Sequence, residues 1–200
     1  MFRPGPNNDL PIGCLVMAAG NSVRFGENKL MIPVDGKAMI RRALETVPAE
    51  KFAAVTVVTQ YSEVEDLAHA FGFHCIRNDH PELGISRTIR LGTEYLGQTC
   101  EAIMYQVSDQ PFLRRKSVCS MIDLFMMHPD RIVCMAHDGT RGNPCIFPKV
   151  FFPELCALSG DKGGGEVIRA HLDRLLLFET DGQELIDADT PTALKKLLST

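Results

Sequence analysis

The 200-residue sequence lacks any apolar stretch close to the roughly 20 residues that a helix needs to cross a bilayer. Residues 1–11 are rich in Pro, Asn and Gly and lack the apolar core of a secretory signal peptide. We therefore expect residues 1–11 to form a flexible extension and residues 12–200 to form a single domain. The protein is expected to be cytoplasmic and to have no membrane partner.

Metal-binding and disulfide patterns are also missing. The seven cysteines include no Cys-x-x-Cys pair, and the six histidines show no metal-ligand spacing. An odd number of widely spaced cysteines in apolar surroundings, as at 132–135, is typical of buried thiols in a reducing compartment. The sequence thus argues against a disulfide-stapled module and against a zinc framework.

Positive charge is not in excess, since the formal net charge is −4, and this argues against a general nucleic-acid binder. The charges are unevenly spread, however. Residues 24–42 carry five cations against two acids, whereas residues 178–190 carry five acids and no cation. Such segments suit a site that holds an anion with a divalent metal, although two solvated surfaces are the simpler explanation.

Short apolar runs rich in Val and Ile alternate with helical spacing. Such runs are typical of strands buried on both faces of a largely parallel sheet. The pattern predicts an α/β fold, a three-layer α/β/α sandwich with a mostly parallel, Rossmann-like sheet. Helices are expected at 64–71, after a capping box at 62–65, at 118–126, and from Thr190 onward. The predicted strands are 12–19, 52–58, 102–107, 132–136 and 175–178.

The first predicted strand runs into Met-Ala-Ala-Gly-Asn-Ser-Val-Arg-Phe-Gly at 17–26. The G-x-x-x-x-G-K-[ST] pattern fails because five residues separate Gly20 from Gly26, and G-x-G-x-x-G lacks its third glycine. Small residues nevertheless let backbone N–H groups approach a ligand, and Arg24 and Lys29 can neutralise phosphates. From the residues alone, an anion site and an ordinary glycine-rich turn are equally good interpretations.

A carboxylate follows the third predicted strand at Asp109, where open α/β sheets expose ligand-binding groups. A simple turn aspartate is the alternative. Asp187 and Asp189 could supply a second carboxylate to a metal, and helix capping is the competing role for Asp189.

Five segments carry a family resemblance. Residues 17–30 resemble the signature L-A-A-G-x-S-x-R-M-G-x-x-K-L of the MobA-like NTP-transferase superfamily, in particular its molybdenum cofactor cytidylyltransferase-like members. These have the nucleotide-diphospho-sugar transferase fold. Four further segments resemble the family's G-D-Q/M-P, R-G-H/N-P-V-L-F, G-D-x-G and D-I-D-T-P motifs in the same order, at 108–111, 141–147, 160–163 and 186–191.

The resemblance implies an Mg²⁺-dependent nucleotidyltransferase, with Mn²⁺ as the alternative metal, that transfers NMP from an NTP to a phosphorylated acceptor such as molybdopterin and releases pyrophosphate. It implies that Arg24, Lys29 and Asp109 are catalytic, with the two cations on the β- and γ-phosphates. Asp109, Asp187 and Asp189 are the implied metal ligands. The implied nucleotide-binding residues are Ala18, Ala19, Gly20, Ser22, Arg24, Gly26, Lys29, Gly84, Ser86 and Thr88.

Two segments bear on specificity. Residues 84–90 stand where cytidylyl-transferring members have a G-x-x-S-S-S-L-like loop, and the Gly-Pro-Leu-Ala-Gly-like segment of guanylyl-transferring members is absent, so CTP is favoured over GTP. Arg87 departs from that loop, and the alternative is a helix start capped by Ser86. The resemblance implies that Arg141, Gly142, Asn143 and Pro144 face the acceptor, whereas a β-turn between strands is the other interpretation of this segment.

Alternative functions come from other classes. One is a nucleotidyltransferase for a sugar or alditol phosphate, and another is a non-catalytic NTP-binding protein that assists a molybdoenzyme or cofactor-biosynthesis partner. The presence of Arg24, Lys29 and Asp109 together argues against a silent binder. An NAD-dependent oxidoreductase is disfavoured by the missing third glycine and by Thr59-Gln60, which replaces an acidic residue after the second strand.

Arg24 offers a direct test of the phosphate interpretation. If its guanidinium stabilises charge on the leaving pyrophosphate, Arg24→Ala should reduce the turnover number more than it weakens nucleotide binding. Steady-state kinetics with nucleotide titration separate the two effects. An unchanged turnover number would contradict this role.

Overall fold

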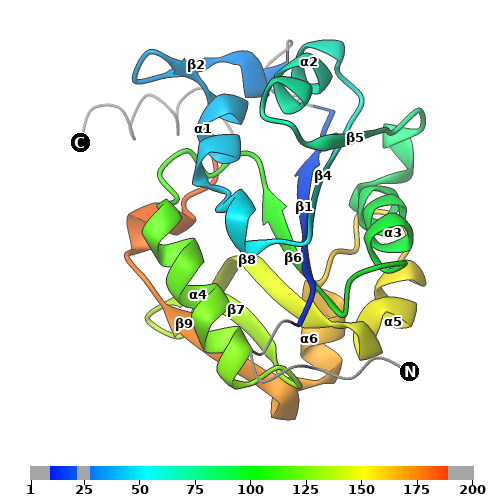
Figure 1. The fold of residues 1–200 in the computed structure, drawn as a ribbon, viewed down its shortest axis with the longest axis vertical. Helices are drawn as coiled ribbons and strands as arrows, with labels where there is room; N and C mark the ends of the chain where they lie inside the picture. The colour runs from blue at the N-terminus through cyan, green and yellow to red at the C-terminus, as the bar shows by residue number, and fades with distance from the viewer. Residues whose placement is uncertain (1–9, 22–27, 189–200) are drawn as a thin grey trace.

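A seven-stranded mixed sheet runs through the computed structural model, which describes residues 10–21 and 28–188 (Figure 1). Its strand order is β5-β4-β1-β6-β8-β7-β9, and β8 is antiparallel to both of its neighbours while the other pairs are parallel. The strands are β1 (Ile12–Ala18), β4 (Ala54–Thr59), β5 (His74–Arg77), β6 (Ala102–Val107), β7 (Ile132–His137), β8 (Thr140–Pro148) and β9 (Leu175–Glu179). A separate hairpin joins β2 (Pro33–Val34) to β3 (Lys37–Ala38).

Helices cover both faces of this sheet (Figure 1). One buried cluster joins the first face to α1 (Met39–Thr46), α2 (Ser62–Ala70) and α4 (Arg115–Met127). The other joins the second face to α3 (Ile85–Leu96), α5 (Phe152–Cys156) and α6 (Gly165–Ala170). The predicted three-layer α/β/α sandwich is therefore confirmed.

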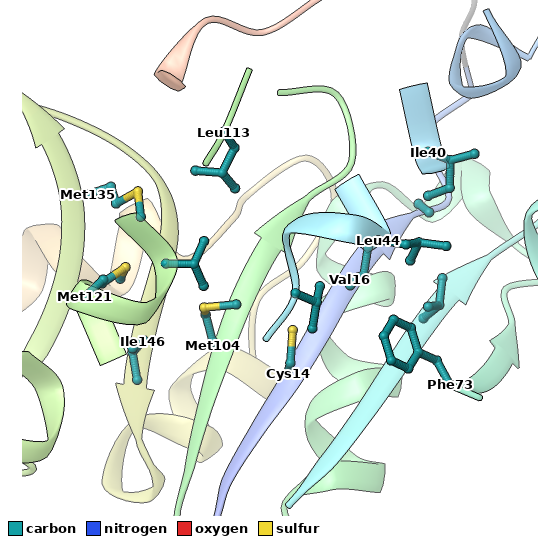
Figure 2. Packing of buried hydrophobic residues seen from close by; sticks show 14 of the residues in the cluster. Cys14, Val16, Ile40, Leu44, Phe73, Met104, Leu113, Met121, Met135 and Ile146 are labelled. Atoms are coloured by element: carbon teal, nitrogen blue, oxygen red, sulfur yellow. The ribbon is translucent and has the colours of Figure 1, made fainter. Parts of the chain in front are cut away.

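Alternation along the strands explains why two cores form. Successive side chains of a strand point to opposite faces. Cys14 and Val16 of β1 pack in the first cluster beside Ile40 and Leu44 (Figure 2), and Leu15 packs in the second. Because both faces are covered, these strands are continuous apolar runs, which made them visible in the sequence.

The five predicted strands are all present, within two residues at each end. The antiparallel β8 is the main departure from a parallel sheet, and it has a local cause. Asp138 and Gly139 both have positive φ, 48° and 72°, and they form a two-residue turn between the paired residues His137 and Thr140. A tight turn of this type can only return the chain as an antiparallel neighbour.

Two predicted helix caps are wrong. Tyr61 is the N-cap residue of α2, and the Ser62 hydroxyl lies 3.3 Å from the Glu63 carboxylate instead of capping the helix. Gly84 is the N-cap residue of α3, so Ser86 lies inside the first turn and is buried.

The helix predicted at 118–126 is confirmed within α4. The helix predicted from Thr190 lies outside the described residues, as does most of the extension predicted at 1–11. Within the described ranges, no helix is long and apolar enough to span a membrane.

Gly92 marks the closest approach of α3 to the sheet. A Cβ at this position would lie 2.4 Å from both Cδ atoms of Leu15 and 2.9 Å from its Cγ, and the Leu15 side chain is 0% exposed. The absence of a side chain at this helix position therefore lets α3 pack against β1.

We expect Gly92→Ala to lower the free energy of unfolding by about 1–2 kcal/mol, because overpacking outweighs the helix propensity that alanine gains. Chemical denaturation measures the change. In a double-mutant cycle, Leu15→Ala should remove much of this cost, so the two changes should be less than additive. A stabilised Gly92→Ala protein would contradict the packing argument.

Candidate functional site

A cleft opens where β1 and β6 end, at the edge of the sheet where parallel strands expose ligand-binding groups. Four parts of the chain meet there: the loop after β1, the turn at 29–30, the segment that enters α3, and the end of β6 with its following loop. Asp161 joins them from a later loop. The lining residues are Met17, Ala19, Gly20, Asn21, Lys29, Leu30, Pro81, Gly84, Ile85, Thr88, Val107, Ser108, Asp109 and Asp161.

Many of the predicted nucleotide-site residues share this cleft. Ala19, Gly20, Lys29, Gly84, Thr88 and Asp109 all line it. Ala18 is buried at the end of β1, and Ser86 is buried in the first turn of α3. Ser22, Arg24, Gly26 and Asp189 lie outside the described residues.

An ion pair joins the two charged residues of the cleft predicted as catalytic. Lys29 Nζ lies 2.7 Å from Asp109 Oδ2, and the two side chains are only 14% and 21% exposed. Lys29 begins a short turn in which the Asn28 side chain accepts a hydrogen bond from the backbone N–H of Leu30. An anion in the cleft would compete for the ammonium group, and a cation would compete for the carboxylate.

The segment that contains Asp187 lies beside Asp109. The backbone N–H of Ala188 donates to the Asp109 carbonyl at 2.8 Å, and Gln110 Nε2 donates to Asp187 Oδ1 at 3.0 Å. Two carboxylates therefore come from neighbouring loops, and carboxylate oxygens suit Mg²⁺ or Mn²⁺.

In the part of the chain that the structure describes, no group of three or more His, Cys, Asp or Glu could hold a metal ion. A metal at Asp109 and Asp187 would therefore need further oxygen ligands, such as those of a triphosphate. This donor set fits the usual Mg²⁺ arrangement of one or two carboxylates with substrate phosphates.

The end of β1 and the loop after it are held by side chains from the last residue of β4 and the two residues that follow it. The carbonyl groups of residues 18–20 accept hydrogen bonds from Thr59 Oγ1 at 2.9 Å, Gln60 Nε2 at 2.9 Å and Tyr61 OH at 2.7 Å. A trans peptide carries its N–H opposite its C=O, so the N–H groups of residues 19–21 point away from the β4–α2 loop. The sequence prediction missed this clamp, although Thr-Gln-Tyr after an apolar strand was a visible signal.

A close contact between two glycines lies beside the cleft. Gly84 has φ +83°, and a Cβ there would lie 2.4 Å from both the carbonyl carbon and the oxygen of Gly160. The backbone N–H of Ser86 donates to the same carbonyl at 3.2 Å. This contact brings Asp161, from the segment predicted to resemble G-D-x-G, into the cleft.

Arg87 is tied to a buried asparagine. Its Nε donates to Asn78 Oδ1 at 3.0 Å, and Asn78 Nδ2 donates to Thr88 Oγ1 at 3.2 Å. Thr88 lines the cleft, whereas Arg87 is not among the lining residues. Arg87 therefore supports the segment that contains Thr88.

The predicted acceptor segment lies within β8, so its interpretation as a β-turn is wrong. Arg141, Gly142 and Asn143 line a second hollow, and Pro144 is buried. A hollow between the two regions is lined by Asn143 and Cys145 and also by Met17, Ile85 and Val107 of the main cleft. The shared lining residues connect the cleft to the face of β8.

Much of the acidic segment has a structural role. Glu184 is 1% exposed, and its carboxylate accepts hydrogen bonds from the Arg114 backbone N–H, Ser117 Oγ and Thr180 Oγ1. It thereby caps the start of α4, and Asp181 pairs with the Arg114 guanidinium at 3.1 Å.

Cations of the early segment, residues 24–42, are likewise paired, with Lys37 and Arg41 on Glu45 and Arg42 on Asp35. The uneven charge distribution is thus a weaker sign of a metal site than it first suggested.

The sequence is similar to those of known proteins over most of its length. A sequence profile of the MobA-like NTP transferase domain matches residues 14–175. The purine catabolism protein PucB of Bacillus subtilis (strain 168) is 29% identical over 189 residues, covering 88% of this chain and 90% of PucB.

Solved structures share the fold. Rv0371c from Mycobacterium tuberculosis H37Rv, in complex with manganese, has a TM-score of 0.80 at 20% identity, covering 95% of this chain and 99% of that chain. CMP:2-keto-3-deoxy-manno-octonic acid synthetase in complex with CTP has a TM-score of 0.72 at 15% identity, with coverages of 94% and 97%.

Removing the Tyr61 hydroxyl tests whether hydrogen bonds from 59–61 hold the loop after β1. Tyr61→Phe removes the hydrogen bond to the Gly20 carbonyl, which is worth about 0.5–1.5 kcal/mol at most. We expect faster amide hydrogen exchange at residues 20 and 21, with almost no change in melting temperature. Tyr95→Phe is the matched control, because Tyr95 stacks on His74 away from the cleft. Equal exchange in both variants would contradict the clamp.

Proposed function

The chain belongs to the MobA-like NTP transferase family of nucleotidyltransferases, and from this premise we propose that it transfers CMP from CTP to a phosphorylated small molecule such as molybdopterin. Pyrophosphate is the other product. The observation that carries the proposal is the convergence of the β1 loop, Lys29 and Asp109 in one cleft.

The triphosphate is assigned to the loop after β1. Its N–H groups point away from the β4–α2 loop, and preorganised N–H groups bind phosphate oxygens without the cost of reorganising. Lys29 lies at the same wall, and we assign it, with Arg24, to the β- and γ-phosphates. The ammonium of Lys29 would then exchange Asp109 for phosphate oxygens.

Asp109 and Asp187 are the proposed metal ligands, with Asp189 as the alternative to Asp187. Bound Mg²⁺ or Mn²⁺ would neutralise charge on the triphosphate, and the manganese complex of Rv0371c supports a divalent ion in this fold. Asp109 is half-buried and pairs with Lys29 at 2.7 Å, so a bound metal would take the place of the ammonium group beside this carboxylate.

The proposed reaction needs little from the protein beyond positioning and charge. A phosphate monoester carries about −1.5 to −2 charge at pH 7, so the acceptor oxygen attacks the α-phosphorus without a general base. The bond to pyrophosphate breaks in line, and Lys29 and Arg24 stabilise the charge that develops on the leaving group. The absence of a Ser-His-Asp or Cys-His pattern in the sequence agrees with this chemistry.

Specificity is assigned to the two ends of the site. Gly84 and Thr88 line the cleft on the side of α3, where the sequence resembles the cytidylyl-transferring members, and the CTP complex of the synthetase supports the same base. The acceptor is assigned to the hollows along β8, where Arg141 offers an exposed cation for an anionic group. A sugar or alditol phosphate is the alternative acceptor.

A panel of nucleotides tests the proposal. With Mg²⁺ present, CTP at about 100 times its Kd should stabilise the protein by about 2.7 kcal/mol, or roughly 5–10 °C in melting temperature, and more than GTP, ATP or UTP at equal concentration. Asp109→Ala should lose the metal-dependent part of this shift. Asp161→Ala is the matched control, because it removes another carboxylate of the same cleft and should keep that part.

The panel contradicts the proposal if no nucleotide stabilises the wild type, or if both variants respond to the metal alike. Pyrophosphate release in the presence of candidate acceptors then separates an enzyme from a non-catalytic NTP-binding partner of molybdoenzyme maturation. A silent binder would give the thermal shift and release no pyrophosphate with any acceptor.

A further inference from the structure

Two thiols meet in the wall of the hollow on β8. Cys134 of β7 and Cys145 of β8 are directly opposed in the strand register, and their Sγ atoms lie 3.2 Å apart. Both residues line the hollow that also contains Arg141 and Asn143. All seven cysteines lie within the described ranges, and among them this is the one pair with a sulfur–sulfur hydrogen bond.

The strand geometry already satisfies the backbone requirement for a disulfide. Opposed residues in antiparallel strands have Cα atoms roughly 4.5–5.5 Å apart, within the roughly 4.4–6.8 Å that disulfides span. The sulfurs need to approach by only about 1.1 Å, from 3.2 Å to about 2.05 Å. The bond can therefore form by side-chain rotation within the existing sheet.

The surroundings favour reaction of this pair over the other buried cysteines. The hydrogen bond from Cys145 lowers the pKa of Cys134, and the same hydrogen bond together with burial raises the pKa of Cys145. Burial instead raises the pKa of Cys14, whose thiol is fully enclosed in the first core. Cys134 and Cys145 are only 0% and 6% exposed, but both line the hollow, which is therefore the route by which a small oxidant would reach the two sulfurs.

We propose that Cys134 and Cys145 form a reversible disulfide in the folded protein when hydrogen peroxide is present. The Cys134 thiolate attacks one peroxide oxygen, the O–O bond breaks, and a sulfenic acid and water form after uptake of one proton. The Cys145 sulfur then attacks the sulfenic sulfur and expels a second water. Two thiols lose two electrons in total, and the peroxide gains them.

The modification would change the acceptor side of the site, an effect that rests on the proposed function. Both sulfurs lie within hydrogen-bond distance of the Gly142 carbonyl, at 3.2 Å and 3.4 Å. A disulfide has no S–H donor, so neither sulfur can then donate to this carbonyl. Gly142 lies between Arg141 and Asn143, and oxidation therefore alters the segment assigned to the acceptor.

Trypsin divides the chain conveniently for a test. Cleavage after Arg131, Arg141 and Lys149 places Cys134 in peptide 132–141 and Cys145 in peptide 142–149, with no other cysteine in either. The folded, reduced protein is treated with hydrogen peroxide, quenched, alkylated in denaturant and digested. We expect one linked pair of these peptides, two hydrogen atoms lighter than their sum, which dithiothreitol separates again.

Variants and an internal control decide the result. Cys134→Ala and Cys145→Ala should each abolish the linked pair, whereas Cys100→Ala, which removes a cysteine of the same core cluster, should retain it. The half-buried Cys119 and Cys156 report that the peroxide was active.

The proposal is overturned if the two peptides remain fully alkylated at a dose that oxidises Cys119 or Cys156. It is also overturned if the linked pair forms only in denaturant, or if either cysteine links elsewhere. The measurement uses no nucleotide, so its failure leaves the proposed function untouched.

Discussion

The site depends on how the first strand ends. Three side chains, at the last residue of β4 and the two residues after it, hold the carbonyl groups of residues 18–20, so the peptide planes there have one orientation. Because β1 and β4 are parallel, their carboxyl ends lie side by side, and the second strand can support the loop of the first. A loop fixed in this way presents its N–H groups without paying for order when a ligand arrives.

Lys29 and Asp109 form an ion pair in the cleft before any ligand binds. Lys29 and Asp109 come from segments 80 residues apart and meet at 2.7 Å in a half-buried site. Either charge alone would be costly to hold with so little exposure, and the pair offsets that cost. The proposed NTP and metal would bring charges of both signs, so together they would replace each partner of the pair with an equivalent one.

Much of the fold could be predicted from the sequence because strands that are covered on both faces are continuous apolar runs. The segments predicted as sites after β1, at Asp109 and in β8 could be singled out because their motifs are local in sequence, and Lys29 and Asp109 do meet in one cleft. The clamp from Thr59 to Tyr61 and the Gly84–Gly160 contact were missed because they depend on which loops become neighbours, and hydrogen-bond partners 41 residues apart leave no local pattern. The capping box predicted at Ser62 was wrong although its pattern is local, because α2 already includes Ser62 and its N-cap residue is Tyr61.

The antiparallel β8 separates the parallel strands β5, β4, β1 and β6 from the parallel pair β7 and β9. Parallel strands on one side end at the cleft, whereas β8 enters between β6 and β7 from that same end, because a two-residue turn reverses the chain after β7. Its first residues, Arg141 to Asn143, therefore lie next to the region where the parallel strands finish. The same reversal places Cys145 opposite Cys134, so one turn at Asp138-Gly139 positions both the segment assigned to the acceptor and the thiol pair in its wall.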